Sequence, residues 1–390
     1  MTRGFSSLKA DAFSESVIRE MSRLASAHGA INLAQGFPDF PCPEELKRAA
    51  AQALYEDVNQ YAVTWGAADF REAIAAHYRP RLGMPIDPHT ELTVTCGATE
   101  AMAAAMIATV NPGDEVIVFE PYYENYGPDA ILCGAIPRFV TLHAPDWHFD
   151  PTALKAAFND RTRAIVINTP NNPTGKVFTR EELALIAECC QQWGVLCITD
   201  EIYEYILYDG AEHVSMRSLP GMAPLTIAIN ALSKTYSVTG WRVGWLLADA
   251  PTTAAIRKVH DFLTVGAPAP LQRAGVTALS LPPSYFDQLA SDYNAKRNAM
   301  MAILDDVGIP YFRPQGAYYL FADIASLGFS DDIAFARHLV ESVGVAVVPG
   351  SSFFHHKPDG ARYVRFCFSK TPQTLTAAHQ RLRSWAQGMA

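Results

Sequence analysis

Short apolar runs alternate with amphipathic stretches through the middle of the chain, from about residue 90 to residue 250. Apolar runs of this length predict buried strands, and the stretches between them have the apolar spacing of helices. The predicted strands are Leu92–Thr95, Glu115–Phe119, Ile136–Thr141, Ala164–Asn168, Val195–Thr199, Leu225–Ile229 and Val243–Leu247. The predicted helices include Thr99–Val110, Glu181–Cys190 and Ala254–Leu263. This order predicts an α/β fold with a mostly parallel, seven-stranded sheet wrapped by helices.

The segments on either side of this core have different patterns. Asp11–Ala27 has helical periodicity and precedes a Gly/Pro-rich turn, while Tyr285–Val307 follows several prolines and predicts a long helix. From Phe312 to the end, the pattern predicts a small α+β unit. We therefore expect a large domain over residues 41–280 and a small domain over residues 281–390. Residues 1–40 are predicted to form an N-terminal arm that packs with the small domain.

Composition excludes several classes of function. The net charge of −9 disfavours nucleic acid or an anionic membrane surface as the main partner. No apolar run approaches the roughly 18 residues that a membrane helix needs, and the first residues lack the apolar core of a signal peptide. The seven cysteines include no CxxC pair, which argues against a disulfide framework and against a metal site. We expect a cytoplasmic protein without a structural metal.

One segment, Asn230–Trp245, carries the most distinctive chemistry. It places Lys234 just after a predicted buried strand, where an amine is costly to desolvate and its pKa shifts readily, which suits Schiff-base formation. Arg242 follows in a loop of Ser, Thr and Gly, and its guanidinium fork matches a phosphate. An aldehyde that also carries a phosphate is pyridoxal 5′-phosphate (PLP). A solvated lysine and arginine in an ordinary loop would have the same sequence.

Three further segments follow predicted strands, at residues 97–99, 168–175 and 200–203. Gly97, Ala98 and Thr99 lie at a strand-to-helix turn, where free N–H groups can bind an anion, although a plain turn is the commoner explanation. The prolines of Asn168–Gly175 hold Asn172 as a potential donor to a ring oxygen, with an Asx turn as the alternative.

Asp200 ends an apolar strand, with Tyr203 three residues later. A sheltered carboxylate must be paired, and a protonated ring nitrogen would be a suitable partner. The alternative is a helix N-cap. Tyr123 lies among aromatics that could stack on a flat ring or pack in the core. Arg365 alternates with apolar residues in a predicted strand and needs an anion, either a substrate carboxylate or an internal salt bridge.

With these motifs in place, the chain resembles the class I/II aminotransferases, PLP enzymes of fold type I, over residues 14–385. The resemblance is carried by NTPNNPTG, TDEIYE, SKTYSVTGWRVGW and VRFCFS. Within that group, LASAHGAINLAQGFPDF and EPYYENY are similar to the kynurenine aminotransferase, glutamine transaminase K and methionine or aromatic aminotransferase branch.

The resemblance implies a role for each matching position. Lys234 would bond to the cofactor and then move the proton at the substrate Cα, Asp200 would pair with the ring nitrogen, and Tyr203 would hold the ring oxygen together with Asn172. Tyr123 would stack on the ring, and Arg365 would hold the substrate α-carboxylate with Asn172 and Gly36. The phosphate ligands would be Gly97, Ala98, Thr99, Ser233 and Arg242, joined by Tyr61 of a second copy. A homodimer with shared active sites and a ping-pong mechanism are therefore expected.

Departures from this branch bear on the substrate. Val265-Gly266 and Ile18 stand where kynurenine-type members carry aromatic residues, and Asp261–Pro270 contains no arginine to clasp a second carboxylate. Phe37, Tyr122, Tyr126, Phe353 and Phe354 favour a neutral donor such as methionine, glutamine or an aromatic or kynurenine-like amino acid.

Other functions compete with transamination. A cysteine-S-conjugate β-lyase on the same scaffold would share every cofactor residue, so the sequence leaves it open as the alternative. A non-catalytic binding protein would not need Lys234. A dinucleotide-binding dehydrogenase is disfavoured because no GxGxxG follows the first core strand.

Overall fold

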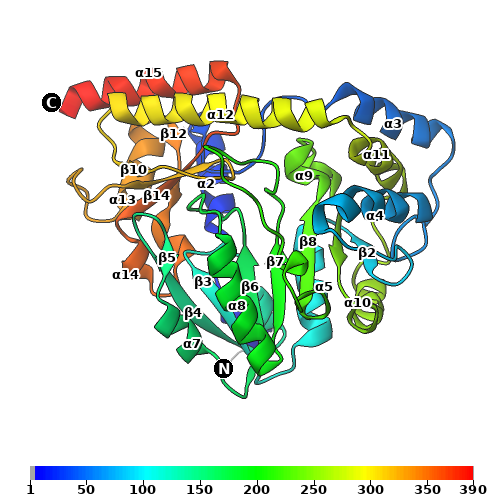
Figure 1. The fold of residues 1–390 in the computed structure, drawn as a ribbon. Helices are drawn as coiled ribbons and strands as arrows, with labels where there is room; N and C mark the ends of the chain where they lie inside the picture. Colours follow the sequence, from blue (N-terminus) through cyan, green and yellow to red (C-terminus); the bar gives the residue numbers. More distant parts are fainter. Residues whose placement is uncertain (1–4, 390) are drawn as a thin grey trace.

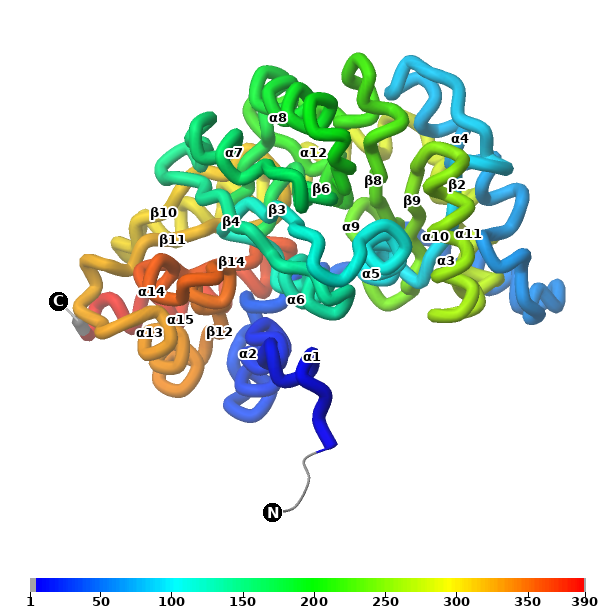
Figure 2. The backbone as a smooth tube through the Cα atoms, turned by 90° about the horizontal axis from the view of Figure 1, so that it is seen from below, coloured from blue at the N-terminus to red at the C-terminus, as the bar shows by residue number. Residues whose placement is uncertain are grey.

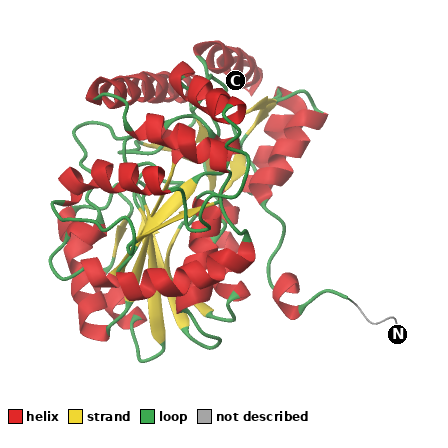
Figure 3. Ribbon diagram, turned by 90° about the vertical axis from the view of Figure 1, so that its right-hand side faces the viewer, coloured by secondary structure: helices red, strands yellow, loops and turns green. Residues whose placement is uncertain are grey.

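The structure is a computed structural model that describes residues 5–389. Its centre is an eight-stranded sheet flanked by helices on both faces (Figures 1 and 3). In spatial order the strands are β2 (Leu92–Thr95), β9 (Gly244–Leu247), β8 (Thr226–Ala231), β7 (Leu196–Asp200), β6 (Thr162–Asn168), β3 (Glu115–Glu120), β4 (Ile136–His143) and β5 (His148–Phe149). The neighbours from β8 to β4 are parallel, whereas β9 runs antiparallel to β8 and β2.

All seven predicted strands are present, and the predicted fold class is confirmed. The sheet gains one strand that the sequence pattern did not indicate, the two-residue β5 at its edge, which pairs antiparallel with β4. A segment of two residues is too short to show a period, so only its pairing identifies it.

Alternation along the central strands divides the core between the two faces of the sheet. In β3, Ile117 and Phe119 join the apolar cluster that contains α8 (Arg180–Trp193), and Val116 and Val118 join the cluster that contains α5 (Ala98–Thr109). Central strands such as β3 and β6 are therefore buried along most of their length because both of their faces are covered, as is typical of parallel sheets.

The remaining helices surround the sheet and the small domain. Near the large sheet lie α3 (Glu44–Tyr55), α4 (Ala68–Leu82), α6 (Tyr126–Leu132), α7 (Pro151–Ala157), α9 (Leu232–Thr235), α10 (Ala250–Leu263) and α11 (Ala269–Leu279). The others are α1 (Leu8–Asp11), α2 (Val17–Ala27), α12 (Pro283–Asp306), α13 (Asp332–His338), α14 (Lys357–Gly360) and α15 (Pro372–Met389). The long helices α12 and α15 lie side by side (Figure 1). Within residues 5–389, no helix combines the length and apolarity that crossing a membrane requires.

A second, antiparallel sheet is built from the C-terminal part of the chain, in the order β10 (Tyr311–Phe312), β11 (Tyr319–Asp323), β14 (Tyr363–Cys367) and β13 (Val348–Pro349). The N-terminal segment adds β1 (Ile31–Asn32), which pairs parallel with β12 (Val345–Ala346). Figure 2 shows α2 beside β12. The domain limits 1–40, 41–280 and 281–390 stay a prediction, and residues 1–4 of the predicted arm lie outside the described residues.

The single helix predicted over Asp11–Ala27 is wrong, because α1 ends at Asp11 and α2 begins at Val17. The cause is a long-range contact. Ser16 caps α2 by accepting from the Arg19 N–H, and its Oγ donates to Glu124 Oε2 at 2.5 Å. Glu124 Oε1 also accepts from the Ile18 N–H at 3.2 Å. A serine N-cap is a local signal for a helix start, whereas the contact with Glu124, in the loop after β3, has no local signature.

Candidate active site

A cavity of about 1080 Å³ opens at the carboxyl ends of the parallel strands. Ligands bind at this edge in open α/β sheets because the loops there converge. The predicted site residues that line it are Gly36, Ala98, Thr99, Tyr123, Asn172, Asp200, Tyr203, Ser233, Lys234, Arg242 and Arg365. They come from both sheets, so the cavity lies where the large sheet, the small sheet and the N-terminal segment meet.

Lys234 lies on the short helix α9, directly after β8. Its Nζ donates to the Gly36 carbonyl at 3.1 Å and lies 5.6 Å from the centre of the Tyr318 ring. Burial lowers the pKa of Lys234 to about 8, although the nearby charge of Asp200 acts in the opposite direction. The amine therefore loses its proton closer to neutral pH than an ordinary lysine, which favours nucleophilic attack on a carbonyl.

Asp200 is the last residue of β7, and its carboxylate is buried. No helix begins after it, so the N-cap alternative does not apply. Oδ2 accepts from the Tyr126 hydroxyl at 2.8 Å, and Oδ1 makes only a long contact of 3.4 Å with the Ile202 N–H. Burial raises the pKa of Asp200 to about 6. A carboxylate held this way is suited to pair with a cationic group that enters the cavity.

Replacement of Asp200 by asparagine should stabilise the cofactor-free protein. The pKa of Asp200 is raised from 3.8 to about 6, so the folded state penalises the carboxylate form. This penalty is absent below pH 3.8, grows until about pH 6 and is complete above it, where it reaches about 3 kcal/mol. Denaturant unfolding of Asp200→Asn and wild-type protein at pH 4, 6 and 8 should show a stability gain that increases with pH.

Asp209→Asn provides a control of opposite sign. Arg297 and Arg313 hold the pKa of Asp209 well below its ordinary value, so its carboxylate stabilises the fold at neutral pH. Asp209→Asn should therefore cost stability at pH 8 and little at low pH. A pH-independent difference between Asp200→Asn and wild type would contradict the assignment of a penalised carboxylate.

The predicted anion loop forms a tight cradle. Gly97 has φ +83° and precedes α5, and a Cβ built on it would meet the Arg242 guanidinium at 2.5 Å. Arg242 donates to the Thr239 carbonyl at 3.0 Å and has no carboxylate within ion-pair distance among residues 5–389. An arginine without a carboxylate at the N-terminus of a 12-residue helix fits a phosphate.

Gly97→Ala should weaken PLP binding by about tenfold or more, because displacing the guanidinium removes a charge-assisted contact worth roughly 1.5–3 kcal/mol. The matched control is Gly113→Ala, where φ is +89° and a Cβ would meet nothing within 4 Å. Both variants place alanine at a positive φ, but only the Cβ at position 97 meets Arg242, so only Gly97→Ala should raise the PLP dissociation constant measured by fluorescence titration. Equal weakening in both variants would contradict the cradle.

Arg365 lies on β14 and is completely buried. It donates to Asn172 Oδ1 at 2.7 Å and to the Ala34 carbonyl at 2.6 Å, and its guanidinium lies 4.2 Å from the centre of the Tyr319 ring. Its Nε is buried without a hydrogen-bond partner. Among the described residues no carboxylate pairs with it, so the salt-bridge alternative does not apply. A buried cation in this state fits an anionic ligand.

The side chains around these charged groups are aromatic. The Tyr203 and Tyr319 hydroxyls are 3.0 Å apart, and Tyr123 packs edge-on against Tyr126 with ring centres 5.9 Å apart. Asn172 Oδ1 accepts a hydrogen bond from Arg365. The Asn172 Nδ2 group has no hydrogen-bond partner in the described part of the chain, so it is available to donate to a ligand.

Three predicted residues do not line the cavity. Gly97 precedes the lining residues Ala98 and Thr99 and lies against the Arg242 guanidinium. Tyr61 is 85 % exposed and does not line it, so a single chain does not bring Tyr61 to the site. Phe353 is fully buried and packs with its ring centre 5.0 Å from the Arg365 guanidinium instead of lining the pocket. Its contact suggests that it supports Arg365 rather than contacting substrate.

Sequence reasoning missed three features. Tyr126 was assigned to the substrate pocket, but its hydroxyl binds Asp200. The Tyr318 hydroxyl donates to the Gly36 carbonyl, and the Tyr319 hydroxyl is hydrogen-bonded to that of Tyr203. The only sequence signal for these two contacts was the pair of tyrosines at the start of a strand. Residues 12–17 and Arg19 also line the cavity, whereas only their neighbour Ile18 had been placed at the substrate by the resemblance.

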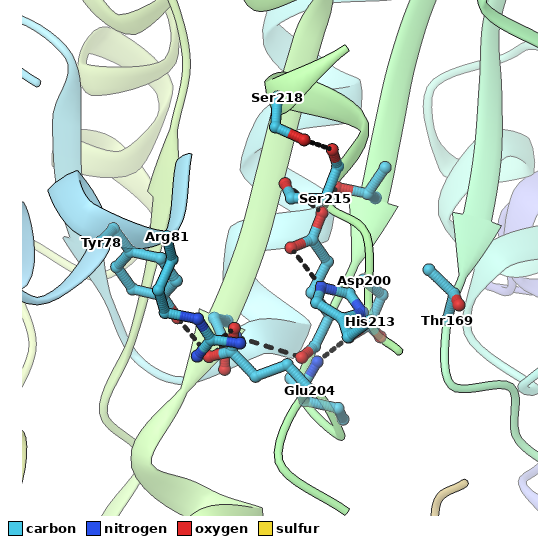
Figure 4. A network of polar contacts seen from close by, with 12 residues as sticks. Tyr78, Arg81, Thr169, Asp200, Glu204, His213, Ser215 and Ser218 are labelled. Atoms are coloured by element: carbon cyan, nitrogen blue, oxygen red, sulfur yellow. Dashed lines mark hydrogen bonds and ion pairs between the residues drawn. The ribbon is translucent and has the colours of Figure 1, made fainter. Parts of the chain in front are cut away.

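A buried polar network lies behind the loop that follows Asp200 (Figure 4). Glu204 pairs with Arg81 at 3.1 Å, and Glu201 Oε2 lies 3.0 Å from His213 Nε2. The ligand atoms of Glu201, Glu204 and His213 lie within 4.8 Å of one another, a spacing that could hold a metal ion. Hydrogen bonds and the ion pair with Arg81 already engage all four carboxylate oxygens of Glu201 and Glu204, so we interpret the network as a support for the loop after Asp200.

Comparisons with known proteins agree with this geometry. Residues 28–382 match the family "Aminotransferase class I and II". The chain is 38% identical to human kynurenine–oxoglutarate transaminase 1, over 94% of each chain. The solved structure of N-succinyldiaminopimelate aminotransferase from Mycobacterium tuberculosis is 39% identical with a TM-score of 0.94, covering 97% of this chain and 99% of that one. A methionine aminotransferase structure from Escherichia coli is 35% identical with a TM-score of 0.93, covering 98% and 100%.

Proposed function

Since the chain belongs to the class I and II aminotransferases, and is therefore a PLP-dependent enzyme of fold type I, we propose that it moves the amino group of a neutral amino acid to a 2-oxo acid. The donor is methionine, glutamine or an aromatic or kynurenine-like amino acid. The relatives named above differ in substrate, so the family alone does not choose among these donors.

The observation that supports this proposal is the buried Arg365 without a carboxylate partner in the cavity that also contains Lys234 and Asp200. Every amino acid and every 2-oxo acid presents a carboxylate next to the reacting carbon. A guanidinium fork binds that group with two parallel hydrogen bonds and so fixes the orientation of the α-carbon.

We assign the residues to roles from this geometry. When bound, PLP supplies an electron sink for the substrate α-carbon. Lys234 Nζ acts as the base that removes the α-proton, and its lowered pKa makes the unprotonated amine accessible. Asp200 holds the ring nitrogen in its protonated form, and Tyr126 keeps the carboxylate in place.

The other predicted residues bind and orient the cofactor. Asn172 Nδ2 and the Tyr203 hydroxyl would donate to the ring oxygen, and Tyr123 would cover the ring face. The phosphate is held by Ala98, Thr99, Ser233 and Arg242, at the start of α5 and beside the Gly97 cradle.

The preference for a neutral donor rests on the lining of the cavity. Ile18, Phe37, Tyr122 and Phe354 line the cavity and bring aliphatic and aromatic side chains to it. Burying apolar side chains there stabilises the complex by about 25 cal/mol per Å². A carboxylate side chain among these groups would lose hydration without gaining a fixed, buried cation.

A spectroscopic titration tests the function directly. Purified, PLP-saturated protein is mixed with methionine, glutamine, phenylalanine, kynurenine or aspartate while its visible absorbance is recorded. We expect the band of the lysine-bound cofactor to bleach most at low concentrations of a neutral donor and to return when a 2-oxo acid is added. The half-saturating concentrations then rank the donors.

Two other outcomes would contradict the proposal. A band that persists while a β-substituted amino acid yields pyruvate and ammonia, without an oxo-acid acceptor, would identify a β-lyase. Bleaching by aspartate at lower concentration than by every neutral donor would overturn the donor class while leaving transamination intact.

We also propose that two copies of the chain form a homodimer. Tyr61 and Val63 are exposed, as are Phe262 and Val265, and the two segments meet where Gly266 approaches the Thr64 carbonyl. An exposed apolar surface of this kind marks an interface. Light scattering should give twice the mass of 42.7 kDa, and a monomer that retains full activity would refute the proposal.

A further inference from the structure

His260 is a histidine of α10 whose ring joins two remote segments. It lies near the carboxyl end of that helix, and its side chain is fully buried. Nδ1 of the ring lies 2.7 Å from Glu100 Oε1 on α5, and Nε2 lies 2.7 Å from the carbonyl oxygen of Thr64, in the loop before α4. Both nitrogens of the His260 ring therefore face oxygen atoms.

These two contacts determine the protonation of His260. A carbonyl oxygen only accepts hydrogen bonds, so Nε2 carries a proton and donates it to Thr64. Because Glu100 is ionised, Nδ1 must donate as well, since its lone pair would otherwise face a carboxylate oxygen. Although burial lowers the pKa of His260, its hydrogen bonds with Glu100 and Thr64 raise it above the ordinary value of 6.5. The ring is thus an imidazolium paired with a carboxylate.

Glu100 brings this pair to the phosphate cradle. It belongs to the first turn of α5, and its Oε2 accepts from the Cys96 N–H at 2.7 Å. The Cys96 carbonyl oxygen in turn lies 3.5 Å from Arg242 Nη2. The Glu100 carboxylate therefore holds the backbone turn that precedes Gly97 and that Arg242 contacts.

The negative charge of Glu100 opposes phosphate binding at the same helix end. A helix N-terminus favours anions through its free N–H groups and its dipole, so a carboxylate there competes with a phosphate. Two like charges repel more strongly in a partly buried site than in water. The His260 imidazolium contacts the carboxylate and offsets its charge.

We propose that His260 is a positioning residue for the cofactor phosphate: its imidazolium neutralises Glu100, which then holds the Cys96 backbone without repelling the phosphate. This inference rests on the proposed placement of the phosphate at the start of α5. The pair is fixed from the other side, because the Thr64 carbonyl holds the ring and Cys96 Sγ donates to the Gly266 carbonyl at 3.4 Å.

The ionisable groups around His260 come from α5, from α10 and from the turn between β2 and α5. Glu100 and Asp261 both favour the imidazolium by their charge. Burial raises the pKa of the Cys96 thiol, so this group stays neutral while the histidine titrates, and Arg242 keeps its charge throughout. The imidazolium is lost as the pH rises above 6.5 and through the raised pKa of His260, and the affinity for phosphate should fall with it.

The test compares PLP with pyridoxal, the same aldehyde without the phosphate, on cofactor-free His260→Gln and wild-type protein. At pH 6 we expect the dissociation constant for PLP to rise about 10-fold and that for pyridoxal to stay within about twofold, since one unit charge near the phosphate is left uncompensated. The difference in PLP affinity should shrink at pH 9, where wild-type His260 is neutral. Absorbance and fluorescence titrations measure both constants.

Removing the opposing charge as well should restore the affinity. Glu100→Gln combined with His260→Gln leaves no carboxylate at this position, so PLP should bind more tightly than to His260→Gln alone. Glu100→Gln by itself keeps the contacts, since its amide oxygen can accept from the Cys96 N–H and its amide nitrogen can donate to Nδ1 of a neutral His260. Its preference for PLP over pyridoxal should lack the fall with pH of the wild type, which tests the inference even if His260→Gln does not fold.

His213→Gln is the matched control, because the buried side chain of His213 makes the same kind of pair, with Glu201 at 3.0 Å, in the network behind the loop after Asp200. This variant should change the affinities for PLP and pyridoxal by the same factor. Equal losses for both aldehydes in His260→Gln, or a wild-type fall with pH in Glu100→Gln, would overturn the inference and leave His260 a packing role.

Gly97→Ala separates this inference from the proposed function. If Gly97→Ala weakens PLP binding and His260→Gln does not, the phosphate lies at α5 and only the inference fails. If neither variant changes the preference for PLP over pyridoxal, the placement of the phosphate and the inference fail together. The titration with amino donors decides transamination independently of both results.

Discussion

Lys234→Ala lowers kcat of transamination by about 10²–10⁴-fold or more, since a positioned base contributes that much to a proton transfer and the variant has no substitute amine. Nζ of Lys234 lies inside the cavity, 3.1 Å from the Gly36 carbonyl. Stopped-flow absorbance of the half-reaction with a good donor measures the loss directly, and PLP should still bind through the phosphate cradle.

Stability measurements separate this effect from unfolding. Burial lowers the pKa of Lys234 from 10.5 to about 8, so its ammonium form costs the fold stability below pH 8. That cost declines as the pH rises from about 8 to 10.5, where the unfolded chain also loses its proton. Cofactor-free Lys234→Ala should therefore be at least as stable as wild type at pH 7.

Lys176→Ala is the control, because this buried lysine pairs with Glu182 outside the cavity and its loss should reduce stability with kcat intact. Wild-type turnover in Lys234→Ala would remove the lysine from the mechanism.

Arg365→Lys raises KM for the amino acid by about 30-fold or more, because losing one partner of a buried charge pair costs roughly 2–5 kcal/mol. Lysine keeps the charge but lacks the planar fork that binds a carboxylate with two hydrogen bonds. It also loses the contacts with Asn172 and Ala34 that aim the guanidinium. Steady-state kinetics should show the largest effect in kcat/KM.

A substrate comparison distinguishes recognition from structural damage. The preference for an amino acid over the amine that lacks its carboxylate should fall in Arg365→Lys. Arg297→Gln is the matched control, since Arg297 is also buried but is paired with Asp209 through two hydrogen bonds. Its loss should affect stability and leave the preference unchanged. An unaltered preference in Arg365→Lys would mean that another group holds the α-carboxylate.

The arrangement of the core could be predicted from the sequence because it follows from local patterns. Strands such as β3 and β6 contain unbroken apolar runs, Val116–Phe119 and Ala164–Ile167, and such runs occur where both faces are covered by helices. Parallel strands align their carboxyl ends at one edge, so Asp200 and Lys234 were expected to meet there, and the structure lines one cavity with both. The contact that holds the start of α2 against the rest of the fold could not be predicted, because Glu124 is 108 residues away from Ser16.

By itself, the sequence determined the α/β architecture and the chemical types at the strand ends, because burial and turn formation leave periodic marks along the chain. Tertiary structure decided which charges stay unpaired. Arg365 meets Asn172 across 193 positions of sequence and finds no carboxylate there, and Tyr126 reaches Asp200 across 74. Whether a buried charge is neutralised within the protein or left for a ligand depends on the distances between segments that are remote in sequence. The electrostatic energy between two charges depends on their distance in space, and the periodicity of the sequence does not determine that distance.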